Sequence, residues 1–255
     1  MNSILPGAEP IFLKGKHKIG ILCLHGFTGS PWDFRELGNF LNRKGFWVSA
    51  PLLAGHGTSP SDLANTKWED WYNSAEEAYS SLQKHCNKII IIGVSLGASL
   101  GFILVKKYPV AGFVSIGGAY KIYGKLKWLS YLAKIFWPLF PFYKKGYQQG
   151  RLSSEIISHR VGYSKIPVRA VRELRLAIKK GANSLDKIKC PVLLIQARSD
   201  HAVARGNISK LTSHIASENV KIIQADAYHV VIIDTNREKW FGEIYDFISE
   251  LDQLD

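Results

Sequence analysis

The chain has little of the material from which disulfide frameworks, membrane spans and interdomain linkers are made. Its 255 residues hold three cysteines, Cys23, Cys86 and Cys190, with no C-x-x-C pair, so buried thiols in a reducing compartment are expected. No run of 18 consecutive apolar residues suggests a membrane span, and residues 1–12 do not resemble a signal peptide. No repeat or Pro/Gly/Ser-rich linker divides the chain. We therefore expect a cytoplasmic protein whose core needs no covalent staples.

Acidic residues are missing from one segment. Between Lys121 and Arg151 there are seven Lys or Arg and no Asp or Glu, in a chain of net charge +12. Lysines among aromatic side chains suit an anionic membrane surface or a lipid aggregate, and suggest peripheral contact at the inner membrane surface. No nucleic-acid motif accompanies them, so nucleic acid is not an expected partner. A solvated basic face over an ordinary apolar pocket stays open as the alternative. The aromatic residues of this segment are Tyr123, Trp128, Tyr131, Phe136, Trp137, Phe140, Phe142, Tyr143 and Tyr147.

Strand-like and helix-like patterns alternate along most of the chain, which predicts an α/β fold with a mostly parallel, twisted sheet and helices on both faces. A further antiparallel strand is expected at Ile11–Leu13. Residues 120–187 lack a convincing sheet strand, and we predict that they form a helical cap, or lid, over a core made of residues 1–119 and 188–255. The strand-like runs are Ile19–Leu24, Phe46–Ala50, Ile89–Val94, Gly112–Ile116, Val192–Ala197 and Val220–Gln224, and the helical patterns are Pro31–Lys44, Trp68–His85, Leu96–Lys107, Arg205–Ala216 and Arg237–Leu251.

The stretch from Gly93 to Gly97 reads G-x-S-x-G between an apolar strand and a helix, the context of a nucleophile elbow. The strand would end in a strained turn that exposes the Ser95 hydroxyl over the sheet edge. The glycines allow that turn to close, and the following helix N-terminus favours developing negative charge. Ser95 is therefore the predicted nucleophile.

A serine hydroxyl needs a base to activate it and a third group to orient that base. His229 follows the last strand and comes last in the chain order Ser…Asp…His. Asp200 follows the strand at 192–197, so its carboxylate is expected at the same sheet edge. Asp226 lies too near His229 in sequence to reach its ring, and Asp234 is expected to cap the final helix. Asp200 and His229 thus complete the predicted catalytic triad.

Two backbone N–H groups are expected to form the oxyanion hole. One belongs to Leu96, directly after the nucleophile, and the other to Phe27, in the glycine-containing loop after the strand at 19–24. His25 and His56 lie in such loops and are expected to support turns rather than act as bases. We predict that four aromatic residues hold the acyl chain, namely Phe27, Trp128, Phe136 and Trp137.

Five motifs together resemble those of the bacterial monoacylglycerol lipases and related cytosolic carboxylesterases, of the α/β-hydrolase fold. Their order and spacing cover nearly the whole chain. The resemblance implies hydrolysis of monoacylglycerols or of short- to medium-chain acyl esters, with no metal and no cofactor, and a small helical cap. It agrees with the predicted triad and oxyanion donors. The motifs are residues 25–29 (HGFTG), 55–57 (GHG), 93–97 (GVSLG), 196–200 (QARSD) and 229–231 (HVV).

Two alternatives to ester hydrolysis remain open from the sequence. The same triad could act on thioesters or lactones, or in acyl transfer, because attack on the carbonyl is common to all of them. A ligand-binding homologue of low turnover is the other alternative, although an intact triad argues against it.

Overall fold

Seven strands form one twisted sheet in the order β1-β3-β2-β4-β5-β8-β9. The computed structural model describes residues 3–145, 154–198, 200–204 and 206–252. β1 runs antiparallel to β3, and the other neighbours are parallel. The strands are β1 Ile11–Leu13, β2 Ile19–Leu24, β3 Trp47–Ala50, β4 Lys88–Val94, β5 Gly112–Ile116, β8 Val192–Ala197 and β9 Val220–Ala225.

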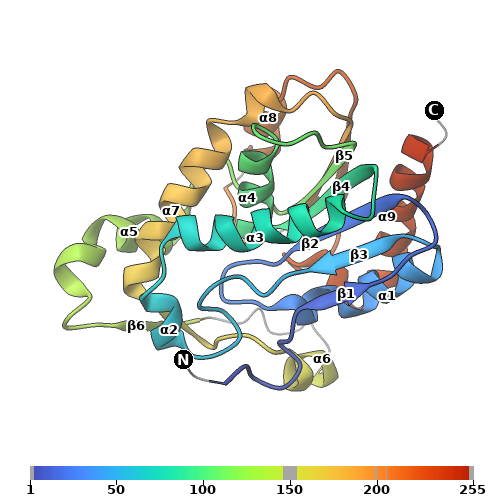
Figure 1. Cartoon of the computed structure of the whole chain (residues 1–255). Coiled ribbons are helices and arrows are strands. Elements are labelled where there is room, and N and C mark those ends of the chain that lie inside the picture. The colour runs from blue at the N-terminus through green and yellow to red at the C-terminus, as the bar shows by residue number, and fades with distance from the viewer. Residues whose placement is uncertain (1–2, 146–153, 199, 205, 253–255) are drawn as a thin grey trace.

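Helices cover both faces of this sheet (Figure 1). Side chains alternate across a strand, so β4 sends Ile90 and Ile92 into one apolar cluster and Ile89 and Ile91 into the other. The first cluster lies under α1 and α9, and the second lies under α3, α4, α7 and α8. The helices outside the 120–187 segment are α1 Arg35–Arg43, α2 Pro60–Ala64, α3 Trp68–Gln83, α4 Leu96–Leu104, α8 Asn207–Thr212 and α9 Arg237–Asp252.

The predicted parallel strands are confirmed, each to within one residue at either end. The predicted helix at 31–44 begins as a single 3-10 turn, Pro31–Phe34, before α1. The helix α2 was not predicted, although Ser59 caps it by accepting a hydrogen bond from the Asp62 N–H and Pro60 occupies its first position. The antiparallel strand at 11–13 is confirmed, and it lies at the sheet edge beside β3.

In its described part, the segment between β5 and β8 adds three α-helices and a small hairpin. The helices are α5 Gly124–Phe136, α6 Ser154–His159 and α7 Val168–Ala182, and the strands β6 Phe142–Lys144 and β7 Lys165–Pro167 pair antiparallel apart from the main sheet. That pairing was not predicted.

One helix of this segment packs directly on the core. A Cβ atom on Gly181 of α7 would lie 2.7 Å from the carbonyl oxygen of Ser99 on α4, so the two helix backbones are nearly in contact. The side chain of Asn207, at the start of α8, holds the first residues of the segment in place. It donates to the Gly118 carbonyl and accepts from the Tyr120 N–H, each at 2.8 Å. The division into core and cap stays a prediction, with α7 contributing to both.

The cysteines are free, and Cys23 and Cys86 are buried. Burial raises the pKa of the Cys86 thiol, which favours the neutral form. Across the part of the chain that the structure describes, no helix has the length and apolarity needed to cross a membrane.

Candidate active site

Ser95 occupies a strained turn between β4 and α4. Its φ of 51° and ψ of −109° lie outside the conformations that non-glycine residues ordinarily adopt, and its N–H donates to the Ile116 carbonyl of β5 at 2.9 Å. Leu96, the next residue, is the first of α4, where a backbone N–H has no acceptor within the helix. The turn therefore presents a hydroxyl beside a free helix N-terminus.

The two flanking glycines are required by close packing. A Cβ on Gly93 would lie 2.5 Å from the backbone N of Ala98, and a Cβ on Gly97 would overlap the carbonyl oxygen of Leu24. Neither obstacle is a flexible side chain, so a larger residue would force the turn open. This geometry explains why the sequence has glycine on both sides of Ser95.

Asp200 and His229 meet at the carboxyl edge of the sheet. The His229 Nδ1–H donates to Asp200 Oδ2 at 2.6 Å, with the Asp200 side chain 1% exposed. The second carboxylate oxygen, Oδ1, accepts from the N–H groups of Ala202 at 2.8 Å and Val203 at 3.3 Å. A carboxylate with both oxygens hydrogen-bonded keeps its orientation, and its bond to Nδ1–H leaves Nε2 as the free nitrogen of the imidazole.

Neighbouring residues hold the His229 loop in place. Asp234 Oδ2 accepts from the Tyr228 N–H at 2.6 Å, and its other oxygen accepts from the Asn236 N–H at 3.1 Å. Asp234 thus holds the loop that carries the histidine, and α9 begins three residues later, at Arg237. A Cβ on Gly117 would lie 2.6 Å from His229 Cε1, so the imidazole packs directly against the backbone of Gly117.

The loop after β2 carries a second strained residue. Among the described residues, Thr28 and Ser95 are the non-glycine residues with positive φ, and Thr28, at 64°, is β-branched, which makes this conformation costly. Its carbonyl accepts from the Tyr163 N–H at 2.8 Å, and its hydroxyl donates to the Phe27 carbonyl at 2.6 Å. Strain therefore lies on both sides of the site where the oxyanion is expected.

His25 and His56 are buried supports of the neighbouring loops. The His25 Nδ1–H donates to the Gly26 carbonyl at 3.0 Å while Nε2 accepts from the Leu53 N–H at 3.2 Å. Burial lowers the pKa of His25 to about 4 and that of His56 well below its usual value, so both rings stay neutral near pH 7. His25 therefore ties its own turn to Leu53, and the His56 Nδ1–H donates to the Ala54 carbonyl at 3.1 Å within its own loop.

Ser95 and His229 open onto one cavity of about 360 Å³, most of whose lining is apolar. Phe27, one of the four predicted acyl-chain residues, lines it together with Leu126, Ile166 and Leu174 from the 120–187 segment. This shape and lining suit a hydrophobic chain placed beside a reacting carbonyl.

The structure does not bring two of the predicted acyl-chain residues to this cavity. Trp128 is 68% exposed with Lys127 Nζ above its ring, and Trp137 lines a separate hollow beside Ala133 and Arg169. The side chain of Phe136 lies outside the described part of the chain.

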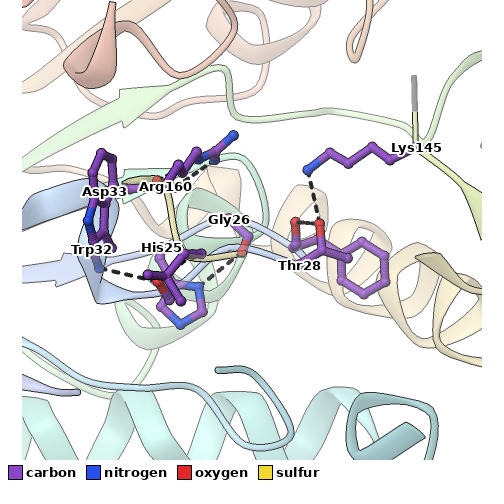
Figure 2. Close-up of polar contacts among 10 residues, drawn as sticks. His25, Gly26, Thr28, Trp32, Asp33, Lys145 and Arg160 are labelled. Carbon is purple, nitrogen blue, oxygen red and sulfur yellow. Dashed lines mark hydrogen bonds and ion pairs between the residues drawn. The ribbon is translucent and has the colours of Figure 1, made fainter. Parts of the chain in front are cut away.

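Three charged residues near the cavity were not anticipated (Figure 2). Arg160 makes a bidentate ion pair with the buried Asp33, both contacts being 2.8 Å. Lys145 donates to the Thr28 hydroxyl at 3.1 Å. Arg160 and Lys145 line the cavity, whereas Asp33 lies behind Arg160 and does not. No local pattern could have indicated this cluster, because 127 residues separate Asp33 from Arg160.

Tyr163 was also missed. Its hydroxyl donates to the Gly55 carbonyl and accepts from the Thr58 N–H, each at 2.9 Å. Its backbone N–H also donates to the Thr28 carbonyl. Tyr163 therefore joins the 120–187 segment to the loop that carries Thr28 and to the loop that carries Gly55 and Thr58.

Sequence relatives span nearly the whole chain. A thermostable monoacylglycerol lipase of Bacillus sp. (strain H-257) is 30% identical over 97% of this chain and 96% of its own length. A carboxylesterase of Bacillus subtilis (strain 168) is 27% identical over 96% of this chain and 97% of its own.

Solved structures agree with these relatives. A metagenome-derived lipolytic enzyme superposes with a TM-score of 0.87 at 29% identity, covering 97% of this chain and 100% of its own. The monoacylglycerol lipase of Paleococcus ferrophilus superposes at 0.79 and 20% identity, over 95% and 98% of the two chains, which supports the fold alone.

The family described as "Serine aminopeptidase, S33" matches residues 15–236. The mostly parallel seven-stranded sheet and the elbow at Ser95 agree with that match. The chain has the α/β-hydrolase fold and belongs to this family of serine hydrolases.

Proposed function

We propose that the protein hydrolyses carboxylic esters of lipid-like substrates, monoacylglycerols or short- to medium-chain acyl esters, through an acyl-enzyme. The observation that carries the proposal is that Ser95 and His229 line the same cavity, while Asp200 is hydrogen-bonded to Nδ1 of the His229 imidazole. The near-full-length relatives named monoacylglycerol lipase and carboxylesterase support it.

In the proposed mechanism His229 Nε2 takes the Ser95 proton as the hydroxyl oxygen attacks the ester carbonyl. Asp200 stabilises the imidazolium that forms, because its Oδ2 accepts from Nδ1–H. The imidazolium then gives the proton to the departing alcohol. Water attacks the acyl-enzyme by the same route, releases the carboxylic acid and restores the serine.

The N–H groups of Phe27 and Leu96 would hold the oxyanion of the tetrahedral intermediate. Leu96 qualifies because it opens α4, and Phe27 because its loop is fixed in place by His25 and Thr28. Donors positioned before the reaction need no reorganisation during it, and losing one commonly costs about 3 kcal/mol of barrier.

The lining charges favour esters over peptides as substrates, although the family description names an aminopeptidase. An aminopeptidase must accept a free α-ammonium group, which is best met by carboxylates. The described residues that line the cavity include Lys125, Lys145 and Arg160 but no Asp or Glu. Cations would repel an ammonium group, whereas a neutral ester meets no such penalty.

Hydrolysis of a p-nitrophenyl ester series of increasing chain length, beside monoacylglycerols, tests the proposal with Ser95→Ala as the control. We expect turnover that disappears in the variant and an optimum at chains that the cavity accommodates. If no ester is turned over although a fluorophosphonate labels Ser95, hydrolysis of thioesters or lactones, or acyl transfer, would be favoured instead. Absence of labelling as well would favour a ligand-binding protein.

We further propose that residues 120–187 act as a cap that rests on an anionic membrane or lipid aggregate, and that the protein is cytoplasmic. Nine of the thirteen exposed large hydrophobic residues of the described chain lie between 123 and 143, and Trp128 and Phe140 are about two-thirds exposed. Lysines lie among them, as such a surface requires.

Sedimentation with vesicles of anionic phospholipid at low salt tests this contact. Trp128→Ser with Phe140→Ser should reduce binding, whereas Ile222→Ser, at an exposed position of β9 outside the segment, should not. Wild-type protein that stays in the supernatant would refute the contact.

A further inference from the structure

The catalytic cavity carries an excess of positive charge on the wall made by the 120–187 segment. Lys145 and Arg160 both line it, and the acidic partner close to them is the buried Asp33. The bidentate pair with Arg160 neutralises that carboxylate, which leaves Lys145 without a carboxylate partner among the described residues.

Lys145 has more hydrogen-bond donors than the described residues use. Its ammonium group carries three N–H bonds, and within the described residues the Thr28 hydroxyl is its hydrogen-bond acceptor. Thr28 uses its own proton on the Phe27 carbonyl, so that hydroxyl is oriented to receive Lys145. At least one N–H of the ammonium therefore remains for a group inside the cavity.

The site retains its charge near neutral pH. Burial and the neighbouring Arg160 lower the pKa of Lys145 to about 8, while Asp33 opposes the change. Burial lowers the pKa of the His25 imidazole, which faces Asp33 and Arg160, to about 4, so this ring stays neutral, and the Tyr228 hydroxyl also interacts with Arg160. A half-buried cation in an apolar cavity binds an anion more strongly than a surface lysine does, because less water screens the interaction.

The pairing of Lys145 with Thr28 places this cation next to the oxyanion loop. Thr28 follows Phe27, the proposed oxyanion donor, and both line the cavity with Ser95. A charged group on the substrate would thus meet Lys145 while its ester carbonyl lies at the serine.

We propose that the preferred substrates are esters bearing an anionic group, a phosphate or a carboxylate, which Lys145 binds beside Arg160. The proposal rests on the ester hydrolysis proposed above and names the substrate class of the same site. The anion could stand on the alcohol, as in an acylglycerol phosphate, or at the far end of the acyl chain, as in a dicarboxylic monoester.

Two matched pairs of esters distinguish an anion on the alcohol from an anion on the acyl chain. The kcat/KM of every ester is measured below the concentration at which it aggregates. Octanoylglycerol and octanoylglycerol phosphate give the same acyl-enzyme and differ in the alcohol. The p-nitrophenyl esters of octanoic acid and of suberic acid monoanion differ at the end of the acyl chain. We expect one anionic ester to exceed its neutral partner by about tenfold to a hundredfold, the range of a hydrogen bond to a charged group.

Lys145→Met should remove that preference, measured as the ratio of kcat/KM for each anionic ester to kcat/KM for its neutral partner, and Lys145→Arg should retain it. Lys144→Met, at the exposed neighbouring position of β6, is the matched control and should behave like the wild type. Fluorophosphonate titration of Ser95 corrects each preparation for its folded, active fraction.

The outcomes distinguish failure of the anion site from failure of the proposed ester hydrolysis. Neutral esters hydrolysed with no preference for either anionic partner, or with a preference that Lys145→Met leaves intact, would overturn the anion site alone. No hydrolysis of any of the four esters by titratable enzyme would overturn ester hydrolysis, and the anion site with it.

Discussion

The ion pair between Asp33 and Arg160 should be among the most sensitive points of the fold. Their side chains are 1% and 11% exposed, so replacing either partner leaves a charge in surroundings that water hardly reaches. Breaking such a pair costs about 3–5 kcal/mol, against a total stability of about 5–15 kcal/mol for a domain. We expect Asp33→Leu and Arg160→Met each to lower the free energy of unfolding by about that amount.

The double variant is expected to be less destabilised than either single variant, because it removes both charges and leaves an apolar contact. Urea unfolding followed by tryptophan fluorescence measures all three, and the coupling energy follows from the double-mutant cycle. The exposed pair of Arg237 and Glu36 supplies the control, since Glu36→Gln should cost no more than about 1 kcal/mol. A cost for Asp33→Leu as small as that of the control, or single effects that add up in the double variant, would refute the reasoning.

Three further predictions concern catalysis. Asp200→Asn should lower kcat/KM on esters about 10³- to 10⁴-fold with little change in urea midpoint, because the amide no longer favours the tautomer in which His229 accepts at Nε2; an activity within tenfold of the wild type would contradict the triad. The preference for an anionic ester should fall as pH rises through about 8, since Lys145 then loses its charge, and a kcat/KM ratio unchanged between about pH 7 and about pH 9 would exclude this lysine. Gly97→Ala should abolish fluorophosphonate labelling, because the added methyl overlaps the Leu24 carbonyl, and labelling at the wild-type rate would show that the turn is not so constrained.

The sheet and the elbow could be predicted because their signals are local. Each parallel strand is a short apolar run, and β4 reads Ile-Ile-Ile-Ile because both of its faces are covered. Ser95, Asp200 and His229 follow strands that end at one edge, so chain order alone placed them near one another. Their roles in catalysis remain predictions that the activity assays test.

Side-chain orientation within the 120–187 segment could not be predicted. Residues two apart on a helix differ by about 200° in direction, so Leu126 at the cavity puts Trp128 on the opposite side of α5. Helical periodicity shows that such faces exist without showing which one meets the core. The many lysine and aromatic residues of this segment gave no indication in the sequence that Lys145 contacts Thr28.

The close approach of Gly181 to Ser99 sets a limit on how the cavity can open. α7 contacts α2, α3 and α4 as well as α5, so it cannot swing outward without pulling the core helices apart. We therefore expect any opening of the cavity to leave α7 in place and to move α5, which packs against α7. Amide hydrogens of α7 should accordingly exchange with solvent on the slow timescale of α4, and those of α5 much faster.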